Sequence, residues 1–181
     1  MKRTKIQRQL TILTNDPSIT AWGYAVLNAA GKVLESGCIK TKSQAKKLRI
    51  RKGDDTIRRV NEINRRLLSI IKKHGVNYIL SELPHGSQNA SAARMIGIVV
   101  GIVQTLSDTL EIGVEWYSEN DAKKIVLGKS SAAKQEMYRA MKFRYDAEWT
   151  GVKYKDEAVA DALAIHYTAS RLSNVLQYYK K

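Results

Sequence analysis

Short runs of apolar residues, separated by polar and turn-forming residues, predict that the chain opens with three β-strands. The second and third of these strands are joined by the turn Ala29-Ala30-Gly31, a pattern typical of a hairpin. Two further apolar runs, set between helical patterns, predict strands later in the chain. The predicted strands cover residues 9–15, 22–28, 32–39, 76–81 and 112–117.

Apolar residues recur at helical spacing between these strands. One amphipathic helix is predicted to begin with Asp54 or Asp55 as its N-cap and to end at Gly75. A second helix, at 89–110, is apolar nearly all round, so it is either central to the core or shared with a second subunit. A pattern that resembles a capping box, at 118–121, predicts another helix start, and two or three helices finish the chain.

Positive charge dominates the composition. Lys and Arg number 31 against 17 Asp and Glu, which gives a formal net charge of +14 and a pI near 9.9. Such a positive field predicts a polyanionic partner. Residues 1–8 form a basic N-terminal extension, and seven basic residues between 40 and 53 indicate an exposed loop or a frayed helix start.

Length and the scarce residue types limit the class of protein. With 181 residues, 44% of them hydrophobic, the chain can bury one sizeable core, so residues 1–181 are expected to form a single domain. The single Cys38 excludes an internal disulfide and fits a reducing compartment, and three scattered His residues do not suit a zinc site. The chain has no long apolar run free of charge, which predicts a soluble, cytoplasmic protein without a membrane partner.

Three acidic residues occupy positions that suit a functional site. Asp16 and Glu82 each end a short apolar run, and strand ends carry the functional side chains of α/β sheets. Asp161 lies in an Ala-rich helical pattern. Any one of these carboxylates, taken singly, is more often a surface or helix-capping residue. Together, in a strongly basic chain, they predict a Mg²⁺ or Mn²⁺ site for phosphodiester chemistry, with two ions about 3.5–4 Å apart.

Recognisable motifs surround these acids. The first is Asn15-Asp16-Pro17-Ser18, followed by Thr20, Gly23 and Tyr24, and the others are residues 35–41, Glu82, the Lys-containing segment 122–134 and residues 160–165. In order and spacing they resemble the motifs of the RuvC family of Holliday-junction resolvases. The resemblance runs over about residues 10–170, and the predicted order of strands and helices is that of the ribonuclease-H-like fold.

The resemblance implies an α/β, ribonuclease-H-like fold, with a mixed five-stranded sheet flanked by helices. It implies a structure-selective DNA endonuclease that acts as a homodimer on branched DNA. Such an enzyme resolves four-way junctions by paired symmetric nicks and leaves 5′-phosphate ends. Two Mg²⁺ ions per active site, with Mn²⁺ as a substitute, would be the cofactor. Asp16, Glu82 and Asp161 would bind the metal, Lys134 would act on the scissile phosphate, and the implied DNA contacts are Lys123, Lys124, His85 and Arg94.

The chain departs from the family's pattern at two places. The family usually has an acid or a His three positions before its last Asp, where this chain has Ala158. Glu157, four positions before Asp161, lies on the same helical face and is predicted to be the fourth catalytic acid and metal ligand, with Asp156 as the alternative. The family also tends to have an aromatic residue just after its second acid, where this chain offers His85. These departures suggest a divergent member, such as a phage enzyme.

Two other classes of protein remain open. A nuclease of the same fold that cuts flaps, other branched DNA or RNA hybrids would use the same acids. A non-enzymatic, basic nucleic-acid-binding protein would explain the charge but not the positions of the acids. A divalent-ion requirement for strand cutting separates the binding protein from the nucleases, and competition between substrates separates the nucleases from each other.

Overall fold

The strands of the computed structural model, which describes residues 9–179, form one mixed sheet of five strands in the order β3-β2-β1-β4-β5. β1, β2 and β3 are antiparallel neighbours, whereas β4 and β5 run parallel to β1. This sheet confirms the predicted fold class and all the predicted strands; the predicted N-terminal extension, residues 1–8, lies outside the described residues. The strands are β1 (Thr11–Asp16), β2 (Ala21–Asn28), β3 (Val33–Lys40), β4 (Tyr78–Leu83) and β5 (Gly113–Ser118).

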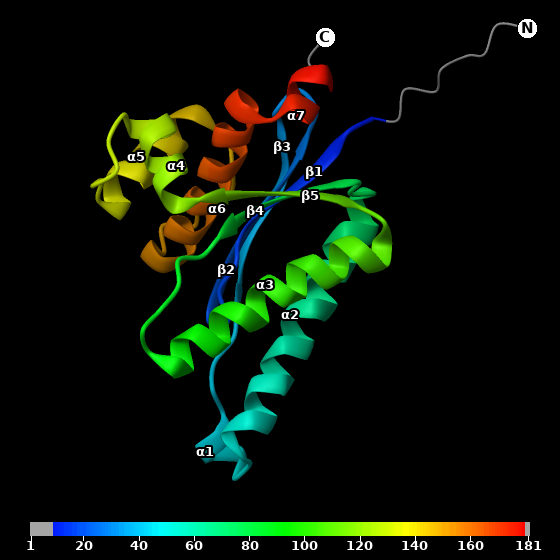
Figure 1. Ribbon diagram of the computed structural model, residues 1–181, viewed down its shortest axis with the longest axis vertical. Helices are drawn as coiled ribbons and strands as arrows, with labels where there is room; N and C mark the ends of the chain where they lie inside the picture. Colours follow the sequence, from blue (N-terminus) through cyan, green and yellow to red (C-terminus); the bar gives the residue numbers. More distant parts are fainter. Residues whose placement is uncertain (1–8, 180–181) are drawn as a thin grey trace, which may run out of the picture.

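Helices cover both faces of the sheet and enclose a separate apolar core on each side. α2 and α3 share one core with the sheet, and α4, α5, α6 and α7 share the other (Figure 1). α6 lies against the middle of the sheet, where it contacts β1 and β2 most extensively. The helices are α1 (Ala45–Leu48), α2 (Lys52–His74), α3 (Ala90–Leu110), α4 (Glu119–Leu127), α5 (Lys134–Arg144), α6 (Lys153–Leu172) and α7 (Asn174–Tyr179).

Side chains along β1 and β4 point alternately to the two faces, and this alternation decides where the acids face. In β1, Ile12 packs into the core that contains α6, whereas Leu13 packs into the core of α2 and α3. In β4, Leu80 also belongs to the α6 core. Asp16 is four residues from Ile12 and Glu82 is two from Leu80, so both acids are on the α6 face of the sheet.

α6 approaches the sheet closely because one strand residue has no side chain. Gly23 of β2 is the register partner of Asp16, and a Cβ there would lie only 1.9 Å from the carbonyl oxygen of Ala158. A hydrogen bond fastens the same contact, since the buried hydroxyl of Thr14 donates to the carbonyl of Ala162 over 2.6 Å. The middle of α6 is therefore held directly over the end of β1.

α3 is an apolar helix with a largely exposed surface. Val99, Ile102, Val103 and Leu106 are buried against α2 and the sheet. By length and composition α3 is the one helix among residues 9–179 that could cross a membrane, with a mean hydropathy of 1.5 over its most apolar 18 residues. Only 28% of those residues are buried. A Cβ added at Gly101 would meet nothing within 4 Å. The structure is compatible with both predictions for this helix, a place in the core and a contact with a second subunit, because one stripe of α3 belongs to the core and the opposite side is uncovered.

The start of α2 differs from the prediction. The helix begins at Lys52 with Arg51 as its N-cap, so neither Asp54 nor Asp55 is the N-cap. Both acids lie in the first turn, where negative charge is favourable beside the helix N-terminus. The predicted end is confirmed, because Gly75 is the C-cap, with the left-handed φ of 61° that suits glycine.

Candidate active site

Three distant segments deliver acids to one end of the sheet. Asp16 is the last residue of β1, and Glu82 lies near the end of β4, the parallel neighbour of β1. The register pairs Asn15 with Ser81, so the two acids follow at adjacent positions on the same face. Asp161 comes from the middle of α6, which packs over these strands. The structure therefore brings together the three acids that the sequence singled out.

Burial and mutual repulsion make the three carboxylates difficult to ionise. Burial, followed by the charges of Asp161 and Glu82, raises the pKa of Asp16 well above its ordinary value. Burial and the charge of Asp161 raise the pKa of Glu82 to about 7. The pKa of Asp161 is raised to about 6, chiefly by burial, although Lys134 opposes this shift. Negative charge is thus concentrated where a cation would relieve it.

Lys134 is the cation that this chain itself supplies to the cluster. Its Nζ lies 3.5 Å from Oδ2 of Asp161, across the gap between α5 and α6. Asp161, and more weakly Asp16, raise the pKa of Lys134, so its ammonium group stays charged at neutral pH. The Lys134 side chain is two-thirds exposed, which leaves it able to contact a phosphate as well as the acids.

Glu157 and Asp156, the two candidates for the fourth acid, have different surroundings. Asp156 is 3% exposed, and its carboxylate accepts hydrogen bonds from the backbone of Thr150 and Gly151 and from the Thr150 hydroxyl. Glu157 makes only a long ion pair of 4.0 Å with Lys153. Its charge also acts on Asp161, whose pKa it helps to raise. Asp156 is therefore bound to the turn before α6, whereas Glu157 has no such partners and its charge is felt at Asp161.

Glu119 is a further acid beside the cluster, and the sequence pattern had assigned it only to a helix start. It is the first residue of α4, directly after β5, and its charge raises the pKa of Glu82 and of Asp161. Its carboxylate pairs with Lys123 over 2.7 Å. Asp16 and Glu82 lie at the ends of their strands, and Glu119 comes directly after the end of β5. This position after a predicted strand is the signal in the sequence that could have identified Glu119. The predicted capping box of α4 is also confirmed, between Ser118 and Asp121.

The residues predicted to contact DNA lie at different distances from the acids. Lys123 lines a small cavity with Glu82, Glu119, Lys134 and Asp161. Lys124, His85 and Arg94 are exposed. Arg94 lies in the first turns of α3 and lines a separate cavity of about 540 Å³ between α3 and the start of α2. Arg94 is therefore set apart from the other candidates.

The acids have the chemistry of a magnesium site but not yet its geometry. Carboxylate oxygens are the hard ligands that Mg²⁺ and Mn²⁺ prefer, and the raised pKa values mark a place where positive charge is lacking. Among residues 9–179, no three His, Cys, Asp or Glu side chains are already arranged to hold one ion together.

Comparison with known proteins extends the match over most of the chain. The family model described as crossover junction endodeoxyribonuclease RuvC matches residues 12–169. A relative of that name from Salmonella choleraesuis is 30% identical over 173 residues, which cover 92% of this chain and 90% of the relative. Another of that name, from Rhodopirellula baltica, is 27% identical over 167 residues, which cover 90% of this chain and 87% of the relative.

Solved structures share the fold at low sequence identity. Thermus thermophilus RuvC, in a complex with a Holliday junction substrate, has a TM-score of 0.67 and 22% identity, over 89% of this chain and 93% of that chain. The yeast mitochondrial Holliday junction resolvase Ydc2 has a TM-score of 0.62 and 13% identity, over 93% of this chain and 81% of that chain. The fold is therefore retained although most residues differ.

Proposed function

The chain belongs to the RuvC family of crossover junction endodeoxyribonucleases, and from this premise we propose that it is a metal-dependent endonuclease that resolves four-way (Holliday) junctions. The observation that carries the proposal is the convergence of Asp16, Glu82 and Asp161 at one end of the sheet, beside Lys134, in a chain of net charge +14. A protein that only binds nucleic acid needs the positive charge, but it has no use for mutually repelling buried acids.

Each residue of the cluster has a role in the proposed hydrolysis. A bond forms between a water oxygen and phosphorus, and the bond from phosphorus to the 3′ oxygen breaks, which leaves a 5′-phosphate and a 3′-hydroxyl. Asp16, Glu82, Asp161 and Glu157 would hold two Mg²⁺ ions, which supply the Lewis acidity for activating water and stabilising the leaving oxygen. Lys134 would neutralise charge on the phosphate, because its Nζ lies 3.5 Å from Oδ2 of Asp161 and its side chain is two-thirds exposed.

A homodimer is the proposed working form. A four-way junction has approximate two-fold symmetry, and two nicks in strands of like polarity need two matching active sites. The uncovered side of α3 suits a self-complementary contact, because Gly97 and Gly101 leave open space where a second helix can approach closely. The exposed apolar character of α3 is explained in this way without a membrane.

A cleavage assay tests the proposed activity. A four-way junction, a flap, an RNA–DNA hybrid and a linear duplex of matched sequence are compared with Mg²⁺, and again with chelator. We expect paired nicks in the junction, 5′-phosphate ends, and no cutting in chelator. Preferred cutting of flaps or hybrids would support the alternative nuclease, and binding without Mg²⁺-dependent cutting would support the non-enzymatic class.

A measurement of the oligomeric state tests the proposed dimer separately from the cleavage activity. Sedimentation should give about twice the chain mass of 20.4 kDa for the wild type. Val100→Glu places a charge on the partly exposed side of α3 and should give folded monomers that make unpaired nicks. A wild-type monomer that makes single nicks would contradict the dimer but leave the metal-dependent chemistry in place.

A further inference from the structure

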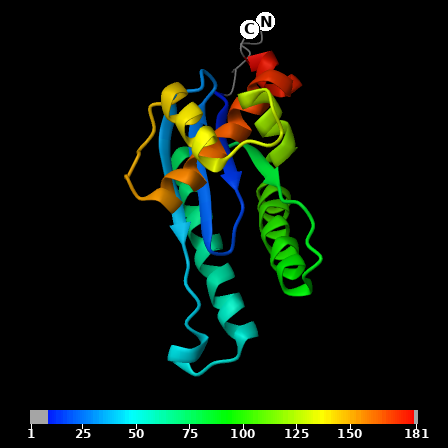
Figure 2. The ribbon, with the colours of Figure 1, turned by 90° about the vertical axis from the view of Figure 1, so that its left-hand side faces the viewer.

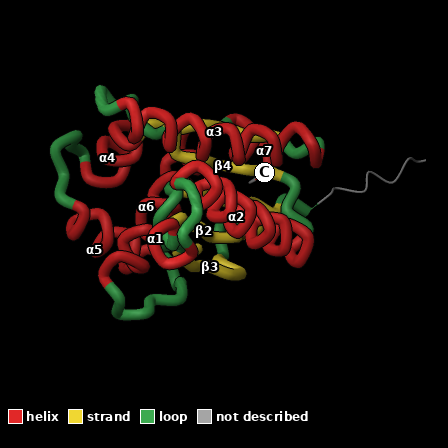
Figure 3. The backbone as a smooth tube through the Cα atoms, turned by 90° about the horizontal axis from the view of Figure 1, so that it is seen from below, coloured by secondary structure: helices red, strands yellow, loops and turns green. Residues whose placement is uncertain are grey.

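One segment between β3 and the second turn of α2 holds a disproportionate share of the positive charge. Residues 40–59, the basic arm, contain nine Lys and Arg and two Asp, a net charge of +7 out of +14 for the chain. The arm comprises the end of β3, α1 and the start of α2. Figures 1 and 2 show that it extends beyond the end of the sheet, and Figure 3 views the molecule from that end. The acid cluster does not use these charges.

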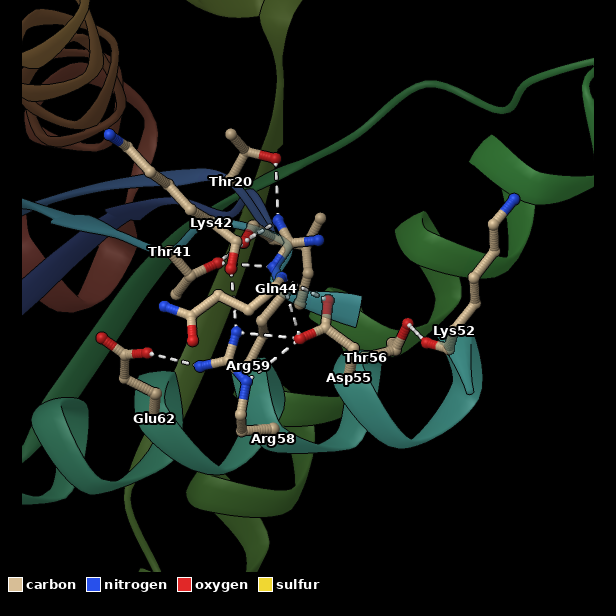
Figure 4. A network of polar contacts seen from close by, with 11 residues as sticks. Thr20, Thr41, Lys42, Gln44, Lys52, Asp55, Thr56, Arg58, Arg59 and Glu62 are labelled. Atoms are coloured by element: carbon tan, nitrogen blue, oxygen red, sulfur yellow. Dashed lines mark hydrogen bonds and ion pairs between the residues drawn. The ribbon is translucent and has the colours of Figure 1, made fainter. Parts of the chain in front are cut away.

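A buried carboxylate holds the arm in a defined shape. Asp55 is 2% exposed and accepts hydrogen bonds from the backbone N–H of Gln44 and from the guanidinium of Arg58 (Figure 4). Arg58 also donates to the carbonyl of Lys42, over 2.8 Å. These bonds join the segment after β3 to the first turns of α2. The arm is therefore folded onto its own helix and does not trail as a free loop.

A second arginine fixes the arm relative to the acid cluster. Arg59 donates to the hydroxyl of Thr41 over 2.7 Å and to the carbonyl of Ile19 over 2.9 Å, and it also reaches the hydroxyl of Thr20 (Figure 4). Ile19 and Thr20 belong to the short loop that follows Asp16 at the end of β1. The position of the arm is thus coupled to the strand end that carries the first acid.

Both acids of the basic arm form ion pairs within it, whereas most of its Lys and Arg side chains are exposed to solvent. Asp54 pairs with Arg51, and Asp55 pairs with Arg58. The cavity of about 540 Å³ beside the arm is lined by three exposed lysines, Lys46, Lys47 and Lys52, and by Ser91 and Arg94 from the first turns of α3. Asp55 is the one acid in this lining, and it already has its partners. The cavity therefore presents cations and a hydroxyl to a ligand.

We propose that the basic arm and the first turns of α3 form a second DNA-binding surface, which binds the phosphate backbone of a double-stranded arm of the substrate outside the acid cluster. This inference rests on the proposed function. Lysine ammonium groups contact phosphates without reading bases. The arm contains no Phe, Trp or Tyr, so it lacks the stacking platforms that single-stranded DNA requires. Duplex DNA is therefore the occupant that this chemistry favours.

The test removes charge from the arm and compares it with the same loss elsewhere. Lys46→Ala with Lys52→Ala is compared with Lys32→Ala and Lys72→Ala, which are exposed but lie outside the arm. Lys72 is 20 residues along α2 from Lys52, about 30 Å at the usual helical rise. Affinity for a four-way junction is measured at several salt concentrations, with chelator in place of metal so that no strand is cut.

We expect the arm variant to lose affinity about tenfold at moderate salt and to reduce the salt slope by about 2, one unit for each lost phosphate contact. Lys46→Arg with Lys52→Arg should restore the affinity, because the charge returns. Progressive shortening of the junction arms should weaken wild-type binding but leave the arm variant little changed. Equal losses in the arm and control variants, or no loss in either, would overturn the proposal.

The two proposals fail in different experiments. Absence of any metal-dependent junction cutting by the wild type contradicts the proposed function, whereas the comparison of affinities remains readable without cutting. A single-stranded oligonucleotide of matched length provides a further check. If it competes with the junction for the arm more strongly than linear duplex does, the assignment to duplex DNA is wrong.

Discussion

The acid cluster and the basic arm lie toward the same end of the sheet but are built in opposite ways. The acids come from β1, β4 and α6, so residues far apart in sequence meet in one place. They are largely buried, and they repel one another. The arm is one continuous segment, its cations are mostly exposed, and its two acids are neutralised internally. One region concentrates unfavourable charge in the core, and the other spreads favourable charge over the surface.

This difference predicts how each region responds to substitution. No neighbouring residue can replace a carboxylate of the cluster, because strand alternation and the contact between α6 and Gly23 determine where each carboxylate lies. A lysine on the arm is one of several with similar access to phosphate, and each contributes a small, salt-dependent share of binding. Single substitutions should therefore decide catalysis, whereas only combined substitutions should change binding strongly.

The largest effect is expected from neutralising an acid of the cluster. Asp16→Asn and Asp161→Asn should each lower the single-turnover cutting rate by about 10³-fold or more, because an amide cannot supply the anionic metal ligand. Junction affinity in chelator should remain near the wild-type value, since phosphate contacts to Lys and Arg provide the binding. Near-normal cutting by Asp161→Asn would show that the active site is elsewhere.

The same substitution should make the metal-free protein more stable. The pKa of Asp16 is raised in the folded state, so ionisation of this group opposes folding above its ordinary pKa, and stability rises as the pH falls. Asp16→Asn removes that unfavourable charge and should raise the melting temperature at pH 7.5, by about 2–4 °C for each kcal/mol gained. The gain should shrink at acidic pH, where the wild-type carboxyl is protonated.

The next effect comes from the glycine that lets α6 reach the sheet. Gly23→Ala puts a Cβ 1.9 Å from the carbonyl oxygen of Ala158, so the helix must move away from β2. We expect a loss of about 1–3 kcal/mol in unfolding free energy and a fall in cutting of about 10²-fold, because Asp161 moves with α6. Gly53→Ala is the control, since a Cβ there meets nothing within 4 Å. Normal cutting by Gly23→Ala would separate the position of Asp161 from this contact.

A third comparison separates the two acids at the start of α6. Glu157→Gln should slow cutting about 10- to 100-fold with little change in stability, because the charge of Glu157 acts on Asp161 and its ion pair with Lys153 is long, at 4.0 Å. Asp156→Asn should instead lower the unfolding free energy by about 1–3 kcal/mol, because it weakens three partly buried hydrogen bonds. The reverse ranking in cutting rate would transfer the role of fourth acid to Asp156.

The contrast between the two regions also explains which parts of the acid cluster could be predicted from the sequence alone. Asp16 and Glu82 could be predicted because each ends an apolar run, and period-two alternation places them on a common face. The closeness of Asp161 to them could not be derived from spacing, because it depends on a contact between Gly23 and Ala158 across more than a hundred residues. The resemblance of its motif to a known family supplied that part.

Local polar contacts were the hardest to foresee. Asp54 and Asp55 have the residue type of an N-cap, yet Arg51 takes that place, and both acids bind arginines. Arg51, the partner of Asp54, lies in the segment 40–53, whose charge had indicated only a loop or a frayed helix start. Glu119 was assigned only to a helix start, although its position directly after a predicted strand is the signal that could have placed it beside the acids.

Releasing the arm should have a smaller effect than damaging the cluster. Asp55→Ala removes the acceptor for Gln44 and Arg58. Hydrogen exchange over residues 42–50 should become faster, and junction affinity should fall severalfold as the lysines lose their fixed positions. Asp54→Ala is a matched control, because its ion pair with Arg51 lies on the surface. Equal effects of the two substitutions would show that Asp55 does not hold the arm in place.

The smallest predicted effect is that of substituting Glu119, which lies beside the acid cluster and forms an ion pair with Lys123. Burial is the main cause that raises the pKa of Glu82 to about 7 and that of Asp161 to about 6, and the negative charge of Glu119 adds to both shifts. Because the ionised carboxylates are the proposed metal ligands, cutting should decline as the pH falls through this range, and added Mg²⁺ should shift the decline to lower pH. Glu119→Gln removes one repelling charge, so both pKa values fall and the acid limb should move to lower pH by a few tenths of a unit.

Glu119→Gln also releases Lys123 from its ion pair, which should tighten junction binding slightly at low salt. Glu111→Gln at the opposite end of β5 removes the same charge away from the cluster and should leave the acid limb unchanged. If Glu119→Gln abolished cutting as Asp161→Asn is expected to do, Glu119 would itself be a metal ligand, and the cluster would contain a fifth essential acid. A shift without loss of the maximum rate would instead assign Glu119 a purely electrostatic role, in which it adjusts the acids from the side and positions Lys123 beside them.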